Sequence, residues 1–343
     1  MIKTAIRFTN LMVITILILL LFSFLLPYFF PGDLLTNISG ITPESERQRE
    51  ALERVLAMDK SIAHQFLQYT QNLLSGSWGV SAVSQESLHA QIMEYFPATI
   101  ELIIYALFFS LLTGIPLGML AGLKHHNIVD FSITSFSIIS YSFPVFWLAM
   151  IFITLFSLQL EWLPTSGRID LLFDVPQITG FVFIDIALSD IEYKSAAFYN
   201  AFMHRILPTL SVALITMALF IRFIRRSIMD VMTKEYIVAA KSRGFTRAQI
   251  VFKHGIKNAL IPILPMLALQ VSTLITNIMI VETIFSWPGI GKWLIEAIYQ
   301  QDYPAIRMGM LIVSLLVMTL TISTEFLTRV LDPAREKVEH ATI

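Results

Sequence analysis

Two short motifs in this chain contain residue types that bind phosphate or metal in other proteins. Pro288-Gly289-Ile290-Gly291-Lys292 combines glycines with a lysine, but it lacks the G-x-x-x-x-G-K-[S/T] spacing that lets backbone N–H groups surround a phosphate. We therefore interpret it as a tight turn. His125 and His126 are adjacent, so on a helix they would point to different faces, and no acidic cluster accompanies them. The pair predicts a solvated turn, and we expect no metal site.

Three glutamates lie near the ends of long apolar stretches, where an ionised side chain is costly to bury. They are Glu101, Glu282 and Glu325. For Glu282 two interpretations stay open: a carboxylate that faces a translocation path through a membrane, or one that stabilises the turn at 286–291. No chain of acids lies near the middle of the stretches, which argues against a proton relay. The chain has no cysteine, which excludes disulfides and thiolate chemistry.

The polar segment 235–262, EYIVAAKSRGFTRAQIVFKHGIKNALIP, separates two apolar runs and is rich in basic residues. Residues 236–242 suit a helix in which Ala239 and Ala240 would allow another protein surface to approach the backbone. Gly244 can adopt a positive φ and end that helix, and Thr246 can cap a second helix over 247–258. Such a segment would transmit rigid-body motion. The alternative is an ordinary basic loop in which this pattern arises by chance.

The elements that position these residues are membrane helices. The chain has 343 residues, of which 55% are hydrophobic and only 14% charged, whereas soluble domains usually have about 25% charged residues. We read the first apolar run as a retained signal anchor, because no small-residue cleavage site follows it. Since about 20 apolar residues span a bilayer as a helix, we expect six spans: 9–30, 99–122, 132–159, 206–226, 259–284 and 307–330.

Basic residues are unevenly distributed among the segments that join these spans. The segment 222–257 has nine lysines and arginines against two acids, whereas the segment 31–98 has four against eight. Short loops rich in Lys and Arg stay in the cytoplasm. The pattern predicts that both termini are cytoplasmic and that the long segments 31–98 and 160–205 lie outside. Residues 44–78 within the first of these read as a small amphipathic helical region.

Motifs along almost the whole chain resemble those of the peptide-type (dipeptide, oligopeptide or nickel) permeases of ABC transporters. Two positions depart from the general pattern: Ser77 stands where an acid is usual, and Val238 replaces the glutamate of the "EAA" coupling loop. The matching motifs are Pro31-Gly32-Asp33, Ser75 to Ser81, Phe96 to Leu102, Gly114 to Gly118, Ala121-Gly122, Ser142 to Trp147, Ala239-Ala240, Gly244, His254, Asn258-Ala259, Pro262, Val281 to Gly291, Asp302-Tyr303-Pro304 and Asp332-Pro333.

The resemblance implies an all-α membrane protein, a six-helix ABC permease bundle with type I importer-like architecture and an extended outer segment after the first helix. Its parts would be an N-terminal tail and first helix (1–30), a periplasmic segment (31–98), a permease core (99–330) with a coupling loop at about 227–258, and a cytoplasmic tail (331–343). The residues implied in ATPase coupling are Tyr236, Ala239, Ala240, Gly244 and His254, although His254 can instead be structural. Phe143 and Trp147 would join Glu282 along the translocation path, or serve only in packing.

The segments 170–190 and 293–303 also resemble the SapB-type permeases, which are linked to antimicrobial-peptide resistance and putrescine export. This implies a bacterial inner-membrane subunit with a SapC-like second permease, two ABC ATPase subunits that bind the ATP, and a periplasmic binding protein, with no nucleic acid and no cofactor of its own. The expected substrates are cationic antimicrobial peptides or putrescine. A dipeptide or oligopeptide importer is the alternative, and an autonomous channel or secondary transporter is a third hypothesis.

Overall fold

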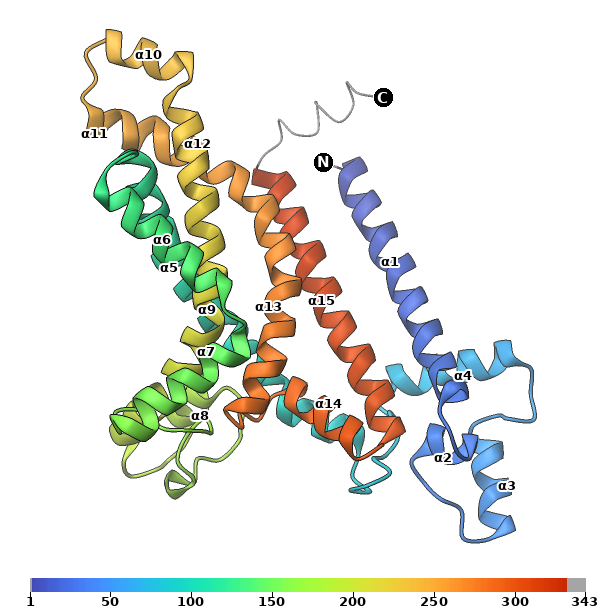
Figure 1. Cartoon of the computed structure of the whole chain (residues 1–343). Coiled ribbons are helices and arrows are strands. Elements are labelled where there is room, and N and C mark those ends of the chain that lie inside the picture. The colour runs from blue at the N-terminus through green and yellow to red at the C-terminus, as the bar shows by residue number, and fades with distance from the viewer. Residues whose placement is uncertain (1, 332–343) are drawn as a thin grey trace. The chain divides into compact units, whose positions relative to one another are not determined.

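The computed structural model describes residues 2–331 of the chain, and nearly all of its ordered elements are helices (Figure 1). The motif Asp332-Pro333 and the tail that follows lie outside the described residues. The α-helices are α1 (Ile2–Leu25), α2 (Leu34–Ser39), α3 (Glu46–Val55), α4 (Ile62–Leu74), α5 (Leu88–Leu123), α6 (Ile128–Ser142), α7 (Val145–Phe152), α8 (Val182–Leu188), α9 (Lys194–Met232), α10 (Glu235–Ser242), α11 (Arg247–Ile250), α12 (Ile256–Leu260), α13 (Leu264–Ile284), α14 (Ile290–Tyr299) and α15 (Tyr303–Leu331).

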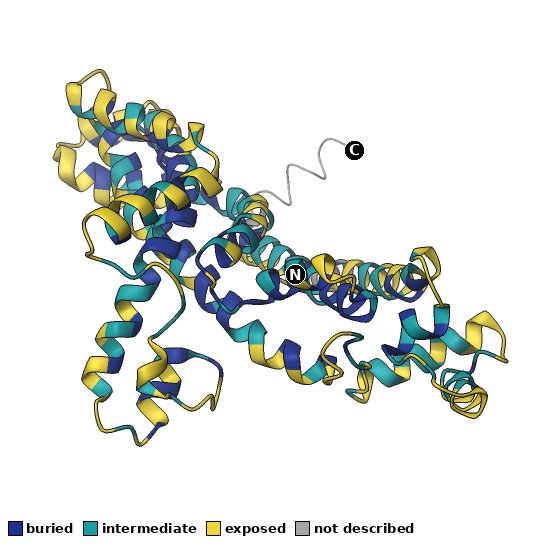
Figure 2. Cartoon of the chain, turned by 60° about the horizontal axis from the view of Figure 1, so that its bottom comes forward, coloured by how far each residue is buried: buried dark blue, intermediate teal, exposed yellow. Residues whose placement is uncertain are grey.

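The chain divides into two compact units. The first unit comprises residues 1–100, 171–194 and 286–319, and the second comprises residues 101–170, 195–285 and 320–343. In both, buried, intermediate and exposed positions alternate along the helices (Figure 2). Exposed apolar side chains are abundant on α1 and α6, as expected for helices that face lipid.

In the first unit, the residues after α1 form a small helical region, as the amphipathic pattern of 44–78 predicts, with α3 and α4 inside that range. Asp33 caps α2 by accepting a hydrogen bond from the Thr36 backbone N–H at 3.2 Å. Burial raises the pKa of the Asp33 carboxyl, but this cap and the neighbouring Arg49 outweigh burial and hold the pKa below its usual value. Gly40 follows α2 with φ of +78°, in contact with the backbone of Val80.

The first unit also contains α14, an amphipathic helix that the sequence analysis did not predict. Where we expected only a tight turn, Gly289 is the N-cap of this helix. Two buried hydrogen bonds fix its start: Trp287 Nε1 donates to the Ala98 carbonyl oxygen at 2.9 Å, and the Ile290 N–H donates to Thr99 Oγ1 at 2.8 Å. The glycine-rich motif thus forms the start of α14, and the Ile290 backbone N–H is bonded to Thr99.

The second unit is built around α9, whose apolar stretch is the most buried of the long helices. Serine hydroxyls from two helices donate hydrogen bonds to its backbone. Ser110 Oγ of α5 binds the Ala213 carbonyl oxygen at 3.0 Å, and Ser137 Oγ of α6 binds the Ala218 carbonyl oxygen at 2.7 Å. A Cβ at Gly122 would lie 2.1 Å from Ile228, so α5 and α9 approach closely only because this residue is glycine.

The described residues contain five helical segments that are long and apolar enough to cross a membrane: Phe8–Phe29, Leu88–Leu123, Lys194–Met232, Arg247–Leu267 and Tyr303–Val330. A sixth is counted when α6 and the helix that follows it are taken as one span. The predicted fifth span, 259–284, corresponds to α12, a 3-10 turn at Ile261–Ile263 and α13. Pro262 and Pro265 account for the irregular turn, because proline lacks a backbone N–H donor.

The predicted third span, 132–159, is formed by a bent pair of helices. It consists of α6 and a second helix, Val145–Gln159, bent by 100° relative to one another. Phe143 has an extended backbone with φ of −95° and ψ of 138°. The cause is Pro144, since its ring disfavours helical geometry in the residue before it and its nitrogen cannot donate.

Candidate functional site

The basic segment singled out in the sequence forms a helical hairpin (residues 235–260) made by α10 and by the helical stretch from α11 to α12 (Figure 1). Ile237 and Ala240 of α10 and Ile250 of α11 are buried against one another, with Met232 and Phe245 packed beside them. The hairpin therefore has its own small apolar core and is an ordered element, as the helix prediction for 236–242 and 247–258 requires.

The turn between the two helices has the geometry predicted from Gly244 and Thr246. Gly244 has φ of +83°, a conformation that favours glycine, and ends α10. Thr246 and Gln249 form a reciprocal capping box: the Thr246 N–H donates to Gln249 Oε1 at 2.9 Å, and the Gln249 N–H donates to Thr246 Oγ1 at 3.3 Å. The orientation of α11 relative to α10 is thus fixed by local hydrogen bonds.

The hairpin exposes both apolar and cationic side chains. Tyr236, Val238 and Phe252 are exposed, and Phe252 is 75% accessible. Ala239 is exposed beside them, whereas Ala240 points into the hairpin core. The exposed basic residues are Lys241, Arg243, Arg247, Lys253 and Lys257. Exposed large apolar side chains near cationic ones are compatible with contact to another protein surface.

His254 lies at the side of this surface. It is partly buried, and its ring makes an edge contact with Phe245, with 6.3 Å between centroids. Tyr236 is also held in place, since its hydroxyl accepts a hydrogen bond from Asn258 at 3.1 Å. The structure thus brings Tyr236, Ala239, Gly244 and His254 into one hairpin, while their docking roles, and that of Ala240, stay predictions.

The hairpin is bonded to two long helices of its unit. Arg247 Nη2 donates to the Leu123 carbonyl oxygen at the end of α5, at 2.7 Å, and Ser227 Oγ of α9 donates to Ala259 of α12 at 2.8 Å. Ile228 of α9 and Ala259 belong to one buried cluster. Hydrogen bonds and buried packing thus connect the hairpin to both α5 and α9.

An ion pair that the sequence analysis missed lies near this anchor. Arg225 of α9 binds Asp130 of α6, and Asp130 also accepts hydrogen bonds from the His126 backbone N–H at 3.2 Å and from Thr134 at 3.1 Å. Asp130 is buried. The available signal was an acid in the first turn of an apolar helix, which is expected to have a partner.

The adjacent histidines contact each other, with 3.6 Å between the ring centroids of His125 and His126. In the part of the chain that the structure describes, no group of three or more His, Cys, Asp or Glu side chains could hold a metal ion. The Lys292 side chain of the glycine-rich motif lies 3.5 Å from Glu296 on α14.

Of the three residues predicted along a translocation path, Glu282 lies on α13, Phe143 at the bend before α7, and Trp147 within α7. Phe143 and Trp147 stack on each other with 4.3 Å between ring centroids, and Trp147 is exposed. Glu282 of α13 is fully buried, and α7 packs against α13. The structure therefore places the two aromatic residues together and Glu282 on a neighbouring helix.

The other two glutamates have basic partners. Glu101 is almost fully buried and accepts a hydrogen bond from Arg168 Nη2 at 2.8 Å. Close to this pair, the Arg205 guanidinium lies over the Tyr105 ring at 4.6 Å. Glu325 pairs with Arg329 at 3.1 Å, one turn along the same helix. A buried cluster thus forms around Glu101, whereas the Glu325 pair is partly exposed.

Comparison with known proteins matches two family models to successive parts of the chain. Residues 1–103 match the N-terminal model of the membrane component of binding-protein-dependent transport systems, and residues 114–337 match the binding-protein-dependent transport system inner membrane component. The second match alone covers more than half of the chain.

Similar proteins carry permease names. The chain is 38% identical over 314 residues to the di/tripeptide transport system permease protein DppB of Pseudomonas aeruginosa, covering 91% of this chain and 92% of the relative. It is 41% identical over 269 residues to the peptide transport system permease protein SapB of Salmonella typhimurium, covering 78% of this chain and 84% of the relative. The putrescine export system permease protein SapB of Escherichia coli is also 41% identical over 269 residues, covering 78% of this chain and 84% of the relative.

The membrane helices, the ordered hairpin between α9 and α13, and these matches agree with the resemblance found in the sequence motifs. The chain belongs to the family of inner membrane components of binding-protein-dependent transport systems, and it is a permease subunit of the ABC peptide-transporter class.

Proposed function

We propose that the helical hairpin receives motion from separate ATPase subunits and passes it to the membrane helices. Tyr236, Ala239 and Gly244 would form the contact, with His254 and the basic residues around them. The observation that carries this proposal is the combination of an exposed apolar and cationic surface with direct hydrogen bonds to α5 and α9. Ala240 would act from inside, because its small side chain lets α10 lie close to α11.

In the same proposal, ATP is bound and hydrolysed by the partner subunits and not by this chain. The complete transporter would contain a second, SapC-like permease, two ABC ATPases and a periplasmic binding protein, in a bacterial inner membrane. Both termini and the hairpin would be cytoplasmic, which agrees with the nine basic residues of 222–257. Residues 31–98 would be periplasmic, residues 99–330 would form the permease core, and Phe143, Trp147 and Glu282 would line its path.

For the substrate, the relatives support two proposals equally. Relatives named SapB are described as peptide-transport or putrescine-export permeases, and relatives named DppB as dipeptide or di/tripeptide permeases. We propose that this chain handles cationic peptides or putrescine, as a Sap-like permease. The alternative is import of dipeptides or oligopeptides, favoured by the 91% of the chain that aligns with the DppB protein.

The coupling role is tested by a matched pair of variants, Gly244→Asp and Gly244→Asn. A Cβ at Gly244 meets no atom within 4 Å, and Asp and Asn both tolerate positive φ, so the two variants differ essentially in charge. We expect Gly244→Asp to reduce transport at least about tenfold, because a carboxylate there opposes the basic character of the surface. Gly244→Asn should keep most of the transport. Full transport by Gly244→Asp, with normal amounts of protein in the membrane, contradicts the assignment.

The substrate is tested by flux in cells that lack the gene and in cells in which it is restored. Labelled putrescine, a labelled dipeptide and a labelled cationic peptide are compared, with Gly244→Asp as the uncoupled control. Putrescine efflux that returns only with the wild-type gene supports the exporter, and uptake of a peptide supports an importer. Flux through the purified chain in liposomes without any ATPase would instead support an autonomous channel or secondary transporter.

A further inference from the structure

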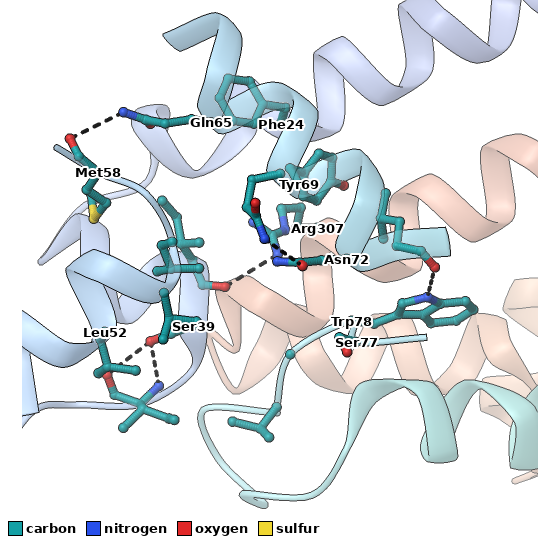
Figure 3. A pocket seen from close by; sticks show the side chains of 18 residues that line it. Phe24, Ser39, Leu52, Met58, Gln65, Tyr69, Asn72, Ser77, Trp78 and Arg307 are labelled. Atoms are coloured by element: carbon teal, nitrogen blue, oxygen red, sulfur yellow. Dashed lines mark hydrogen bonds between the residues drawn. The ribbon is translucent and has the colours of Figure 1, made fainter. Parts of the chain in front are cut away.

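The first unit contains a cavity of about 250 Å³ to which the proposed function assigns no role. Figure 3 shows its lining: Phe24 comes from α1, Ser39 from α2, Leu52 from α3, Tyr69 from α4 and Arg307 from α15. The segment 77–80 closes one side. Elements far apart in the sequence thus meet around one space, and all of them belong to the same compact unit.

Arg307 is the one charged residue among those that line the cavity. Arg307 is 5% exposed, and its guanidinium lies over the Tyr69 ring at 5.2 Å. Among the described residues, its hydrogen bonding consists of one long contact, 3.3 Å from Nη2 to the Ile38 carbonyl oxygen, and Nε has no partner. A guanidinium carries five N–H donors, so most of its donors are unused.

No carboxylate of the described residues forms an ion pair with Arg307. Burial of a charge without a counter-ion is strongly unfavourable. The neighbouring acceptor atoms are engaged elsewhere: Ser39 Oγ accepts from the Ile41 N–H at 3.1 Å, and Gln65 Oε1 accepts from the Tyr28 hydroxyl at 3.1 Å. An anion that enters the cavity would therefore meet a cation without competition.

The rest of the lining is largely apolar. Besides Phe24 and Leu52 it includes Val55, Leu56 and Trp78. The volume corresponds to about eight water molecules at ~30 Å³ each, below the ~300 Å³ at which drug-sized sites begin. The space therefore fits a compact body, and its walls favour a body that is apolar apart from one anionic group.

We propose that this cavity binds an amphiphilic monoanion, whose carboxylate or phosphate group pairs with Arg307 and whose apolar part contacts Phe24, Leu56 and Trp78. Two sources share this chemistry, a small free carboxylate and the phosphate of an anionic phospholipid. Bidentate, charge-assisted hydrogen bonds of arginine to either group are strong. The proposal concerns a site other than the hairpin and does not depend on the transported substrate.

The first experiment uses the full chain in nanodiscs of zwitterionic phosphatidylcholine and measures binding of 3-phenylpropionate by calorimetry. Neutral 3-phenylpropanol, of nearly the same size, is the matched ligand control. We expect the carboxylate to bind at least about tenfold more tightly than the alcohol to the wild type, because only the carboxylate forms a charge-assisted pair. Arg307→Gln should lose this difference, and Arg54→Gln, at an exposed arginine that does not line the cavity, should keep it.

A second variant keeps the guanidinium and fills the space. Ser77 lines the cavity and is exposed, so Ser77→Phe narrows the site with little risk to folding. It should weaken 3-phenylpropionate binding even if Arg307→Gln cannot be purified in folded form. Equal binding of the acid and the alcohol to the wild type, or unchanged binding in Ser77→Phe, would overturn the small-carboxylate source.

The lipid arm uses nanodiscs that also contain phosphatidylglycerol, followed by native mass spectrometry. If phospholipid phosphate is the natural anion, the wild type should retain one more phosphatidylglycerol molecule than Arg307→Gln and Ser77→Phe. Retention that is the same in all three proteins excludes the lipid source. If the carboxylate arm also shows no dependence on Arg307 or Ser77, the cavity does not bind an amphiphilic monoanion and the proposal is wrong.

Discussion

Arg225 donates two hydrogen bonds to Asp130, from Nε to Oδ1 at 2.5 Å and from Nη2 to Oδ2 at 2.7 Å. This bidentate geometry joins α9 to the start of α6 and is the strongest form of arginine–carboxylate pairing. The His126 N–H and the Thr134 hydroxyl donate to the same carboxylate, so each of its oxygens accepts two hydrogen bonds. The pair therefore fixes the distance between two helices close to the anchor of the hairpin.

Asp130→Asn should destabilise the protein clearly. The substitution keeps the shape of the side chain but leaves Arg225 without its counter-ion, and removal of one partner of a buried pair costs about 3–5 kcal/mol. Because Arg225 retains some solvent contact, with 27% of its side chain exposed, we expect the lower end of this range or less. The melting temperature in detergent is the measurement.

The control for this pair is Glu325→Gln. Glu325 binds Arg329 within one helix and is 44% exposed, and such pairs contribute about 0–1 kcal/mol. The double variant Asp130→Asn/Arg225→Gln should be less destabilised than the two single effects added together, since it leaves no unpaired charge. Additive effects, or equal shifts for Asp130→Asn and Glu325→Gln, would show that the pair has no special role.

Glu101→Gln should also lower the melting temperature, and more than Glu325→Gln. Glu101 is 2% exposed and neutralises Arg168 at 2.8 Å, close to a second buried cation, Arg205. Without the carboxylate, Arg168 loses its counter-ion in a largely buried site that also holds the Arg205 charge. If the double variant Glu101→Gln/Arg168→Gln regains part of the lost melting temperature, this account is supported. A melting temperature of the double variant below that of either single variant contradicts it.

The parts of the fold that could be predicted from sequence are those with local causes. Gly244 and Thr246 shape the hairpin turn through their own backbone preferences and hydrogen bonds within three residues, so both were predicted correctly. The apolar runs likewise identify membrane helices through length alone. The bend at Pro144 also has a local cause, but hydropathy averaged over 132–159 hides it.

The remaining features depend on residues that only the tertiary fold brings together. Asp130 and Arg225 are 95 positions apart, and Arg307 and Ile38 are 269 apart, so no spacing pattern connects them. For the same reason the sequence could not show that Ala240 points into the hairpin while Ala239 is exposed. It placed Arg307 merely as the first residue of a span, where the structure shows it inside a cavity.

Alanine at two glycines with the same backbone conformation should have very different effects. Gly40 and Gly244 have φ of +78° and +83°, and an L-residue in this region costs about 1–2 kcal/mol. At Gly244 that is the whole expected cost, because the added Cβ meets no atom within 4 Å. At Gly40 the Cβ would lie 2.0 Å from the Val80 carbonyl oxygen, so the backbone of α2 or of the segment 77–80 must move.

We therefore expect Gly40→Ala to lower the melting temperature at least about twice as much as Gly244→Ala, because the clash adds to the conformational cost. The comparison also determines how the coupling test is interpreted. If Gly244→Ala is nearly as stable as the wild type, loss of transport in Gly244→Asp reflects the charge at the hairpin surface and not unfolding. Equal destabilisation by the two alanine variants would mean that the space around Gly244 is occupied, and Gly244→Asp would then report packing in place of coupling.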